Sequence, residues 1–96
     1  MDAEAVVDER MVYSETAFSE IAIWKLPQRL EGSAHDYKYR LAYVDVCVLR
    51  FDNEAGKGDH VHYGSTESSY QFVSIDELLA DFSKYIQRWN NENGNL

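Results

Sequence analysis

Alternating hydrophobic and polar positions predict short β-strands along the first three quarters of the chain. The strand-like segments are rich in Val, Ile, Tyr, Phe or Trp and span residues 10–13, 17–26, 37–44, 46–51, 60–63 and 70–73. Segment 37–44 shows the clearest pattern, because its odd positions are Tyr or Leu and its even positions begin with Lys38 and Arg40. Turns are expected at 14–16, at Asp45 and at 65–69, and the longest loop is expected at 28–36.

The last quarter of the chain has the period of a helix. Ser74-Ile75-Asp76-Glu77 matches a capping box, and apolar residues then recur at helical spacing from Ile75 to Trp89. Hairpins followed by one amphipathic helix predict an α+β fold, namely a mostly antiparallel sheet of five or six strands with the C-terminal helix packed on one face. The other face is then left for function or for a partner.

Length and composition indicate one domain, residues 1–96, with flexible ends at 1–9 and 91–96. The acidic lead 1–8 could instead begin the first strand through Val6 and Val7. Nine basic and 17 acidic residues give a net charge of -8, which argues against general nucleic-acid affinity. Residues 35–64, however, have a net charge of only -1 and contain all three histidines.

Other features exclude several classes of site and location. The single cysteine, Cys47, lies in an apolar run, which favours a buried, inert thiol. The acidic N-terminus lacks the pattern of a signal peptide, and no segment reaches the ~18 apolar residues of a membrane helix. We therefore expect a cytoplasmic protein that has no membrane contact.

Candidate chemistry is concentrated between residues 50 and 64. Six side chains that can bind protons, metals or phosphates fall within 13 positions: Arg50, Asp52, Lys57, Asp59, His60 and His62. Residues 52–59 are not an EF-hand loop, because Lys57 stands where that loop needs glycine, and they do not match a P-loop. Gly56 and Gly58 permit positive φ on both sides of Lys57, so this turn could present its lysine to an anion.

The spacing His60-x-His62 places both imidazoles on one face of a strand. Three interpretations remain open: two ordinary strand histidines, an acid and a base that flank a phosphate, or a metal site with Asp52 or Asp59 as third ligand. Lys38 and Arg40 share one face of their strand, and Arg50 could join them in a cationic strip. Such a strip beside a histidine is typical of a metal-independent ribonuclease, whereas ordinary surface ion pairs are the competing explanation.

The chain also resembles a known family. The segments IWKLP, HDYKYRLAYV, RFDNEAGKGDHVHYG and YQFVSIDELLADF occur in this order, and from about Arg10 to Trp89 the chain resembles the TumE-like toxins of prokaryotic toxin–antitoxin systems. The resemblance implies a small cytoplasmic toxin, encoded beside a helix-turn-helix antitoxin and acting on RNA or translation. Two departures are the missing Asp-Gly turn at 14–16 and the net charge of -8, which is unlike a basic RNA-cleaving toxin.

The leading hypothesis is a toxin of a type II-like pair with a ribonuclease-like site and no metal or cofactor. Its expected partners are the antitoxin and RNA or the ribosome, and a homodimer is compatible with the sequence. His60, His62 and Lys57 are the candidate catalytic residues, and the candidate substrate-binding residues are Tyr37, Lys38, Arg40, Arg50, Asp52, Asn53 and Asp59. The alternative is a non-enzymatic binding or regulatory module that docks a partner protein.

Overall fold

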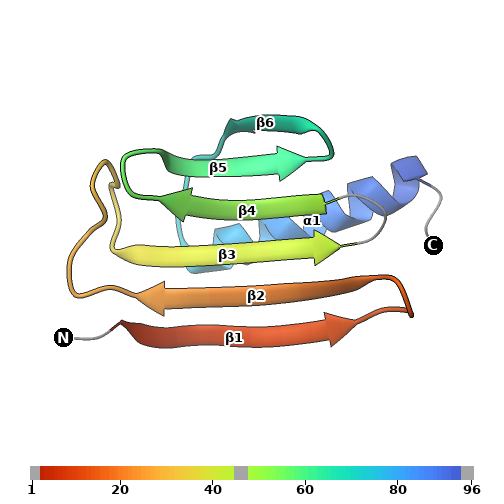
Figure 1. Cartoon of the computed structure of the whole chain (residues 1–96), viewed down its shortest axis with the longest axis horizontal. Coiled ribbons are helices and arrows are strands. Elements are labelled where there is room, and N and C mark those ends of the chain that lie inside the picture. The colour runs from red at the N-terminus through yellow and green to blue at the C-terminus, as the bar shows by residue number, and fades with distance from the viewer. Residues whose placement is uncertain (1–2, 45–47, 94–96) are drawn as a thin grey trace.

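The computed structural model describes residues 3–44 and 48–93 and shows an α+β fold. Six strands form one antiparallel sheet in chain order, and a single helix follows them (Figure 1). The elements are β1 (Glu4–Val12), β2 (Phe18–Lys25), β3 (Tyr37–Val44), β4 (Val48–Glu54), β5 (Gly58–Tyr63), β6 (Thr66–Ser69) and α1 (Ile75–Asn93). The predicted fold class is therefore confirmed.

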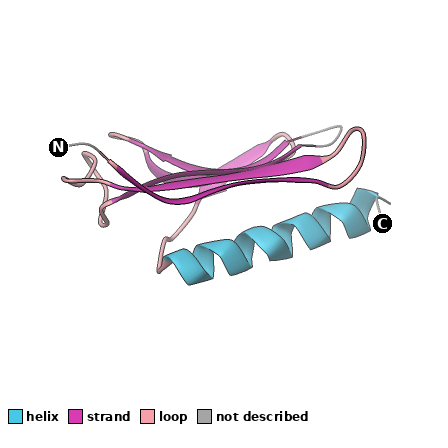
Figure 2. Ribbon diagram, turned by 90° about the horizontal axis from the view of Figure 1, so that it is seen from below, coloured by secondary structure: helices cyan, strands magenta, loops and turns pink. Residues whose placement is uncertain are grey.

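The helix α1 covers only one face of the sheet (Figure 2). The alternating apolar side chains of β3 and β4 point to that face, where Leu41 and Phe51 are fully buried. The Phe51 ring lies between 5.0 and 6.0 Å from the rings of Tyr70, Phe82 and Tyr85. The even residues of the same strands therefore occupy the opposite face, which we call the open face.

The helix begins as the capping pattern predicts. Ser74 Oγ accepts a hydrogen bond of 3.1 Å from the Glu77 amide, which satisfies one of the free N–H groups of the first turn. The helix is longer than the apolar stripe suggested, because it continues to Asn93. Asn90 is buried and accepts a hydrogen bond from the Tyr43 hydroxyl at 2.8 Å, so polar residues extend the contact between helix and sheet.

Ser74→Ala should lower the free energy of unfolding by about 1 kcal/mol, because the cap is lost and no other contact changes. Urea denaturation followed by circular dichroism measures this difference. Ser83→Ala, at an exposed helix position, is the matched control and should not destabilise the protein. Equal stability of the two variants would contradict the capping role of Ser74.

The first and last strands differ from the sequence prediction. Strand β1 begins at Glu4 rather than Arg10, which confirms the alternative in which the acidic lead starts the first strand through Val6 and Val7. The predicted last strand, 70–73, is wrong, because the last strand is β6, Thr66–Ser69. All four residues of β6 are exposed, so the strand has no alternation of apolar and polar side chains. A two-residue turn with Gly64 at φ 63° leads into it from Tyr63. The predicted turn at Asp45 and the thiol of Cys47 lie outside the described residues.

Candidate functional site

The strand register brings the candidate residues together on the open face. Arg40 in β3 lies opposite Asp52 in β4, and Asp52 lies opposite His60 in β5. One step along, Arg50 lies opposite His62. Directly opposed residues of antiparallel strands project to the same side, so these five side chains form two adjacent rows. This register places Arg40 and Arg50 on the same face as the two histidines, as the sequence predicted.

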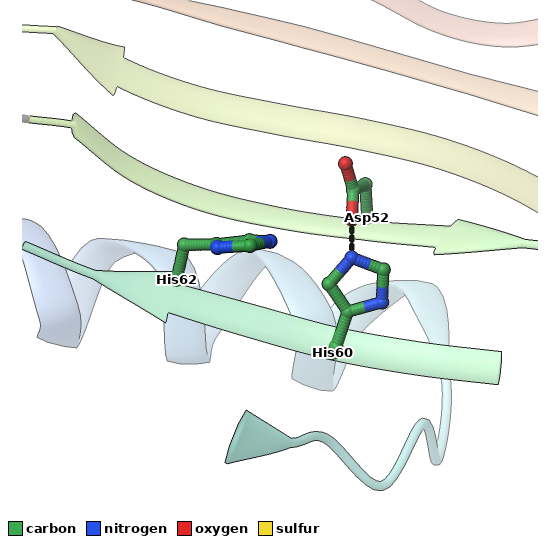
Figure 3. Close-up of side chains that lie close together, drawn as sticks. All are labelled: Asp52, His60 and His62. Atoms are coloured by element: carbon green, nitrogen blue, oxygen red, sulfur yellow. Dashed lines mark ion pairs between the residues drawn. The ribbon is translucent and has the colours of Figure 1, made fainter. Parts of the chain in front are cut away.

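Asp52 and His60 form a buried side-chain contact between β4 and β5 (Figure 3). The Asp52 Oδ1 atom contacts His60 Nε2, and only 5% of the His60 side chain is exposed. On the other side of the ring, His60 Nδ1 lies 3.2 Å from the Gly58 carbonyl oxygen. A carbonyl oxygen only accepts hydrogen bonds, so Nδ1 carries the proton in this contact.

His62 is the more accessible histidine, with 25% of its side chain exposed. Its ring lies 5.0 Å from that of His60 and nearly perpendicular to it. Arg50 Nη2 donates to His62 Nε2 at 3.0 Å, and Arg50 Nε lies 3.0 Å from Asp52 Oδ2. Arg50 therefore connects the two rows.

Glu67 in β6 is part of the cluster, although the sequence reasoning did not identify it. Its Oε2 atom lies 2.9 Å from His62 Nε2, 3.6 Å from His60 Nε2 and 3.0 Å from Lys57 Nζ. The contact with Lys57 lowers the pKa of Glu67 below its ordinary value and raises the pKa of Lys57. Both groups are therefore charged at neutral pH. Glu67 lay in a segment read as a turn, so no periodic pattern could assign it to the histidine face.

Lys57 presents its side chain from the turn between β4 and β5. Gly56 and Gly58 have φ angles of 77° and 81°, as the glycine pattern predicted. Gly56 N donates to the Glu31 carbonyl oxygen at 2.7 Å, so the long loop after β2 contacts this turn. A hollow of about 340 Å³ opens beside it and is lined by Lys57, Asp59, His60, Glu67, Ser68 and Ser69.

Three of the candidate substrate-binding residues lie away from this cluster, among the side chains that face α1. Asn53 is 1% exposed, accepts from the Tyr39 amide at 3.0 Å and donates to the Tyr37 carbonyl oxygen at 2.8 Å. Asp59 accepts from the Tyr39 hydroxyl at 2.7 Å and lies 2.7 Å from His35 Nε2. These contacts join the candidates Tyr37, Asn53 and Asp59 to the scaffold, because they link β3, β4, β5 and the loop after β2.

His35 is the histidine that the sequence reasoning left without a role. The His35 ring lies 4.1 Å from the Phe72 ring. Its neighbour Tyr39 also bonds to Asp59, and burial of the Tyr39 phenol together with this Tyr39–Asp59 hydrogen bond raises the pKa of Tyr39. The Tyr39 phenol therefore remains a proton donor to Asp59. No motif marks His35, because its partners come from two distant segments.

Lys38 and Arg40, the two cations of β3, have different surroundings. Lys38 Nζ donates to the Asn53 carbonyl oxygen. Arg40 is exposed, and within residues 3–44 and 48–93 its side chain makes no ion pair or hydrogen bond. Arg40 is therefore a cation beside Asp52 that is available to an anionic ligand.

The open face thus combines groups that can transfer protons with groups that can bind anions. An accessible imidazole lies beside a guanidinium, and a lysine stands at the edge of the adjoining hollow. Phosphate recognition by arginine and proton transfer by histidine both fit this set. Two imidazoles and a carboxylate within reach of one point are also a ligand set for a transition metal.

Comparison with known proteins gives one match. A family model described as Toxin TumE matches residues 2–90, which is nearly the whole chain. No match was found among curated proteins or among solved structures. Among the described residues, no helix has the length and apolar character needed to cross a membrane.

Proposed function

The chain belongs to the TumE toxin family, and from this premise we propose that it is the toxin of a type II-like toxin–antitoxin pair that acts on RNA through the open face. A helix-turn-helix antitoxin is its proposed partner, and the cytoplasm is its proposed location. The observation that carries the proposal is the position of His62 beside Arg50, in the row next to Arg40 and Asp52.

The proposed reaction is metal-independent cleavage of a phosphodiester by its own 2′-hydroxyl. One base takes the 2′ proton as the 2′ oxygen bonds to phosphorus, and one acid protonates the 5′ oxygen as its bond to phosphorus breaks. His62 is the accessible group for one of these transfers, and Lys57, which lines the adjoining hollow, is the candidate for the other. Arg40 and Arg50 hold the phosphate oxygens.

His60 has a different part in this proposal, because its side chain is almost fully enclosed. Its Nε2 atom contacts the Asp52 carboxylate, and its ring packs edge to face against the His62 ring. We therefore assign proton transfer with RNA to His62 and the orientation of His62 to His60. Asp52 in turn holds both His60 and Arg50 in place.

The test is incubation of the tag-free chain with bacterial RNA and with ribosomes, in buffer containing EDTA. We expect cleavage that leaves a 2′,3′-cyclic phosphate and a 5′-hydroxyl, and we expect His62→Ala to remove it. Loss of all cleavage in EDTA, with recovery on adding a divalent metal, would contradict the metal-independent reaction. Absence of cleavage under every salt and metal condition would contradict the enzymatic proposal as a whole.

Arg40→Ala should weaken the binding of single-stranded RNA of any sequence, because Arg40 contacts phosphates rather than bases in this proposal. The slope of log affinity against log salt concentration should become shallower by about one, which corresponds to the loss of one phosphate contact. Fluorescence anisotropy of labelled RNA at several salt concentrations measures both effects. Arg10→Ala is the matched control, since Arg10 lies on the same face but pairs with Glu20 at 3.6 Å.

If Arg40→Ala and Arg10→Ala change RNA binding equally, Arg40 does not form part of a specific phosphate site. The Arg40 assignment would then be withdrawn, even if the chain cleaves RNA. A loss that is independent of salt would also argue against a phosphate contact.

A groove beside the helix supports a second candidate, a binding module without enzymatic activity. The groove has a volume of about 580 Å³ and lies between α1 and the β1–β2 end of the sheet, where its lining includes Met11, Tyr13, Ile21, Phe82 and Ile86. Met11 is more than half exposed. This candidate predicts a stable complex with the antitoxin and no RNA cleavage by the purified chain.

A further inference from the structure

Three nitrogen and oxygen donors converge on the open face between β4 and β5. One ligand atom from each of Asp52, His60 and His62 can be chosen so that all lie within 4.8 Å of one another. Figure 3 shows that Asp52 and the two histidines project toward the same space from adjacent strands. Glu67 Oε2 approaches the Nε2 atoms of both histidines from β6.

The hydrogen bonds around His60 leave a polar contact that they cannot satisfy. Because Nδ1 carries the proton directed at the Gly58 carbonyl, a neutral His60 has only a lone pair on Nε2. That lone pair faces Asp52 Oδ1, which is also an acceptor. Both atoms are buried, and neither makes a hydrogen bond of acceptable geometry. Two acceptors in direct contact share a proton, or they move apart and share a metal ion.

The orientation of His60 matches that of a metal ligand. Histidines that bind metals commonly donate their second ring N–H to a backbone carbonyl or carboxylate, which fixes the tautomer and the ring position. The Gly58 carbonyl has this relation to His60. Two imidazoles with carboxylates suit zinc and other divalent transition metals better than magnesium or calcium, which prefer oxygen ligands.

We propose that Asp52, His60 and His62 bind one divalent transition metal ion of the zinc class, with Glu67 as a fourth ligand or as a partner of the histidines. Asp59, the other third ligand that the sequence suggested, cannot take part, because it bonds to Tyr39 and His35 on the helix face. The site uses groups from three adjacent strands, so its formation depends on the sheet register.

Arg50 must adjust when the ion binds. Its Nη2 atom donates a hydrogen bond of 3.0 Å to His62 Nε2. This bond uses the Nε2 lone pair that the metal would need. The side chain is 32% exposed and also contacts Asp52 Oδ2 at 3.0 Å, so it can withdraw from His62 while it still neutralises the carboxylate. Arg50→Ala should therefore not abolish metal binding, unlike the removal of a ligand.

The experiment is calorimetric titration of the tag-free chain with Zn²⁺ at neutral pH, together with metal analysis after dialysis. We expect one ion per chain. His62→Ala and Asp52→Asn should each weaken Zn²⁺ binding by at least roughly 10- to 100-fold. Loss of a residue that only hydrogen-bonds to a metal ligand already costs this much, and these two residues are ligands themselves.

Asp59→Asn is the matched control, because it changes the aspartate one residue before His60 but on the opposite face. It should retain the affinity of the unmodified chain. His62 is partly exposed, so His62→Ala remains informative even if a variant at buried Asp52 fails to fold. Absence of stoichiometric Zn²⁺ binding, or binding that His62→Ala leaves unchanged, would overturn the proposal and assign the cation at His60 to a proton.

The metal proposal stands apart from RNA cleavage, because binding is measured without any activity. The two can also be compared if the chain cleaves RNA by the mechanism proposed above. A bound ion would take the histidine lone pairs that proton transfer requires, so added Zn²⁺ should then inhibit cleavage in EDTA-free buffer. Failure to cleave RNA would contradict only the proposed function, whereas failure to bind Zn²⁺ would contradict only the metal site.

Discussion

Expression of the unmodified chain in bacteria that lack its antitoxin should arrest growth, and the His60→Ala, His62→Ala double variant should not. Removing both imidazoles removes the accessible proton-transfer group and the ring that orients it. The loss of general acid–base catalysis typically costs about 10²- to 10⁴-fold in rate. We therefore expect colony counts close to those of cells that carry an empty vector.

The control for this experiment is the Arg10→Ala, Glu20→Ala double variant, which removes another cross-strand pair from the same face. It should arrest growth as strongly as the unmodified chain. Circular dichroism of the purified variants must show equal folding, because His60 is buried. Full growth arrest by a folded double-histidine variant would refute both proton transfer by His62 and its orientation by His60.

Asn53→Ala should lower the free energy of unfolding by about 2–6 kcal/mol. The Cα pairing of β3 with β4 ends at Arg40 and Asp52, and beyond it the Asn53 amide bonds to the backbone of Tyr37 and Tyr39. Alanine would leave these two backbone groups without their partner at a fully buried position, at about 1–3 kcal/mol each. For a domain of this size, that is a large fraction of the total stability.

Urea denaturation followed by tryptophan fluorescence measures the effect, with Asn91→Ala on the exposed side of α1 as the matched control. We expect the control to change stability by less than about 0.5 kcal/mol. Asn53 was also a candidate substrate-binding residue. If Asn53→Ala keeps its stability but loses toxicity, the residue contacts substrate and our structural assignment is wrong.

The sequence predicted well those elements whose buried faces leave a periodic signal. The bounds of β3 are those expected, because Tyr39, Leu41 and Tyr43 alternate on the core side. The helix start followed from a local hydrogen bond between Ser74 and Glu77. By contrast, β6 is exposed on both faces, so nothing in its residue pattern marked it as a strand.

The candidate site was predictable only in part, because alternation gives the relative side of residues within a strand but not the register between strands. His60 and His62 were correctly placed on one face of one strand. The partners of each histidine depended on register, which put Asp52 beside His60 and brought in Glu67 from an unrecognised strand. Asn53 and Asp59 lay in a segment read as a loop, where no side could be assigned to them.

Acidic side chains are exposed along one edge of the sheet. Strand β1, at one edge, exposes Glu4, Asp8 and Glu9, whereas the histidine strand lies near the other edge. Negative charges on an edge strand oppose its pairing with the edge of another copy.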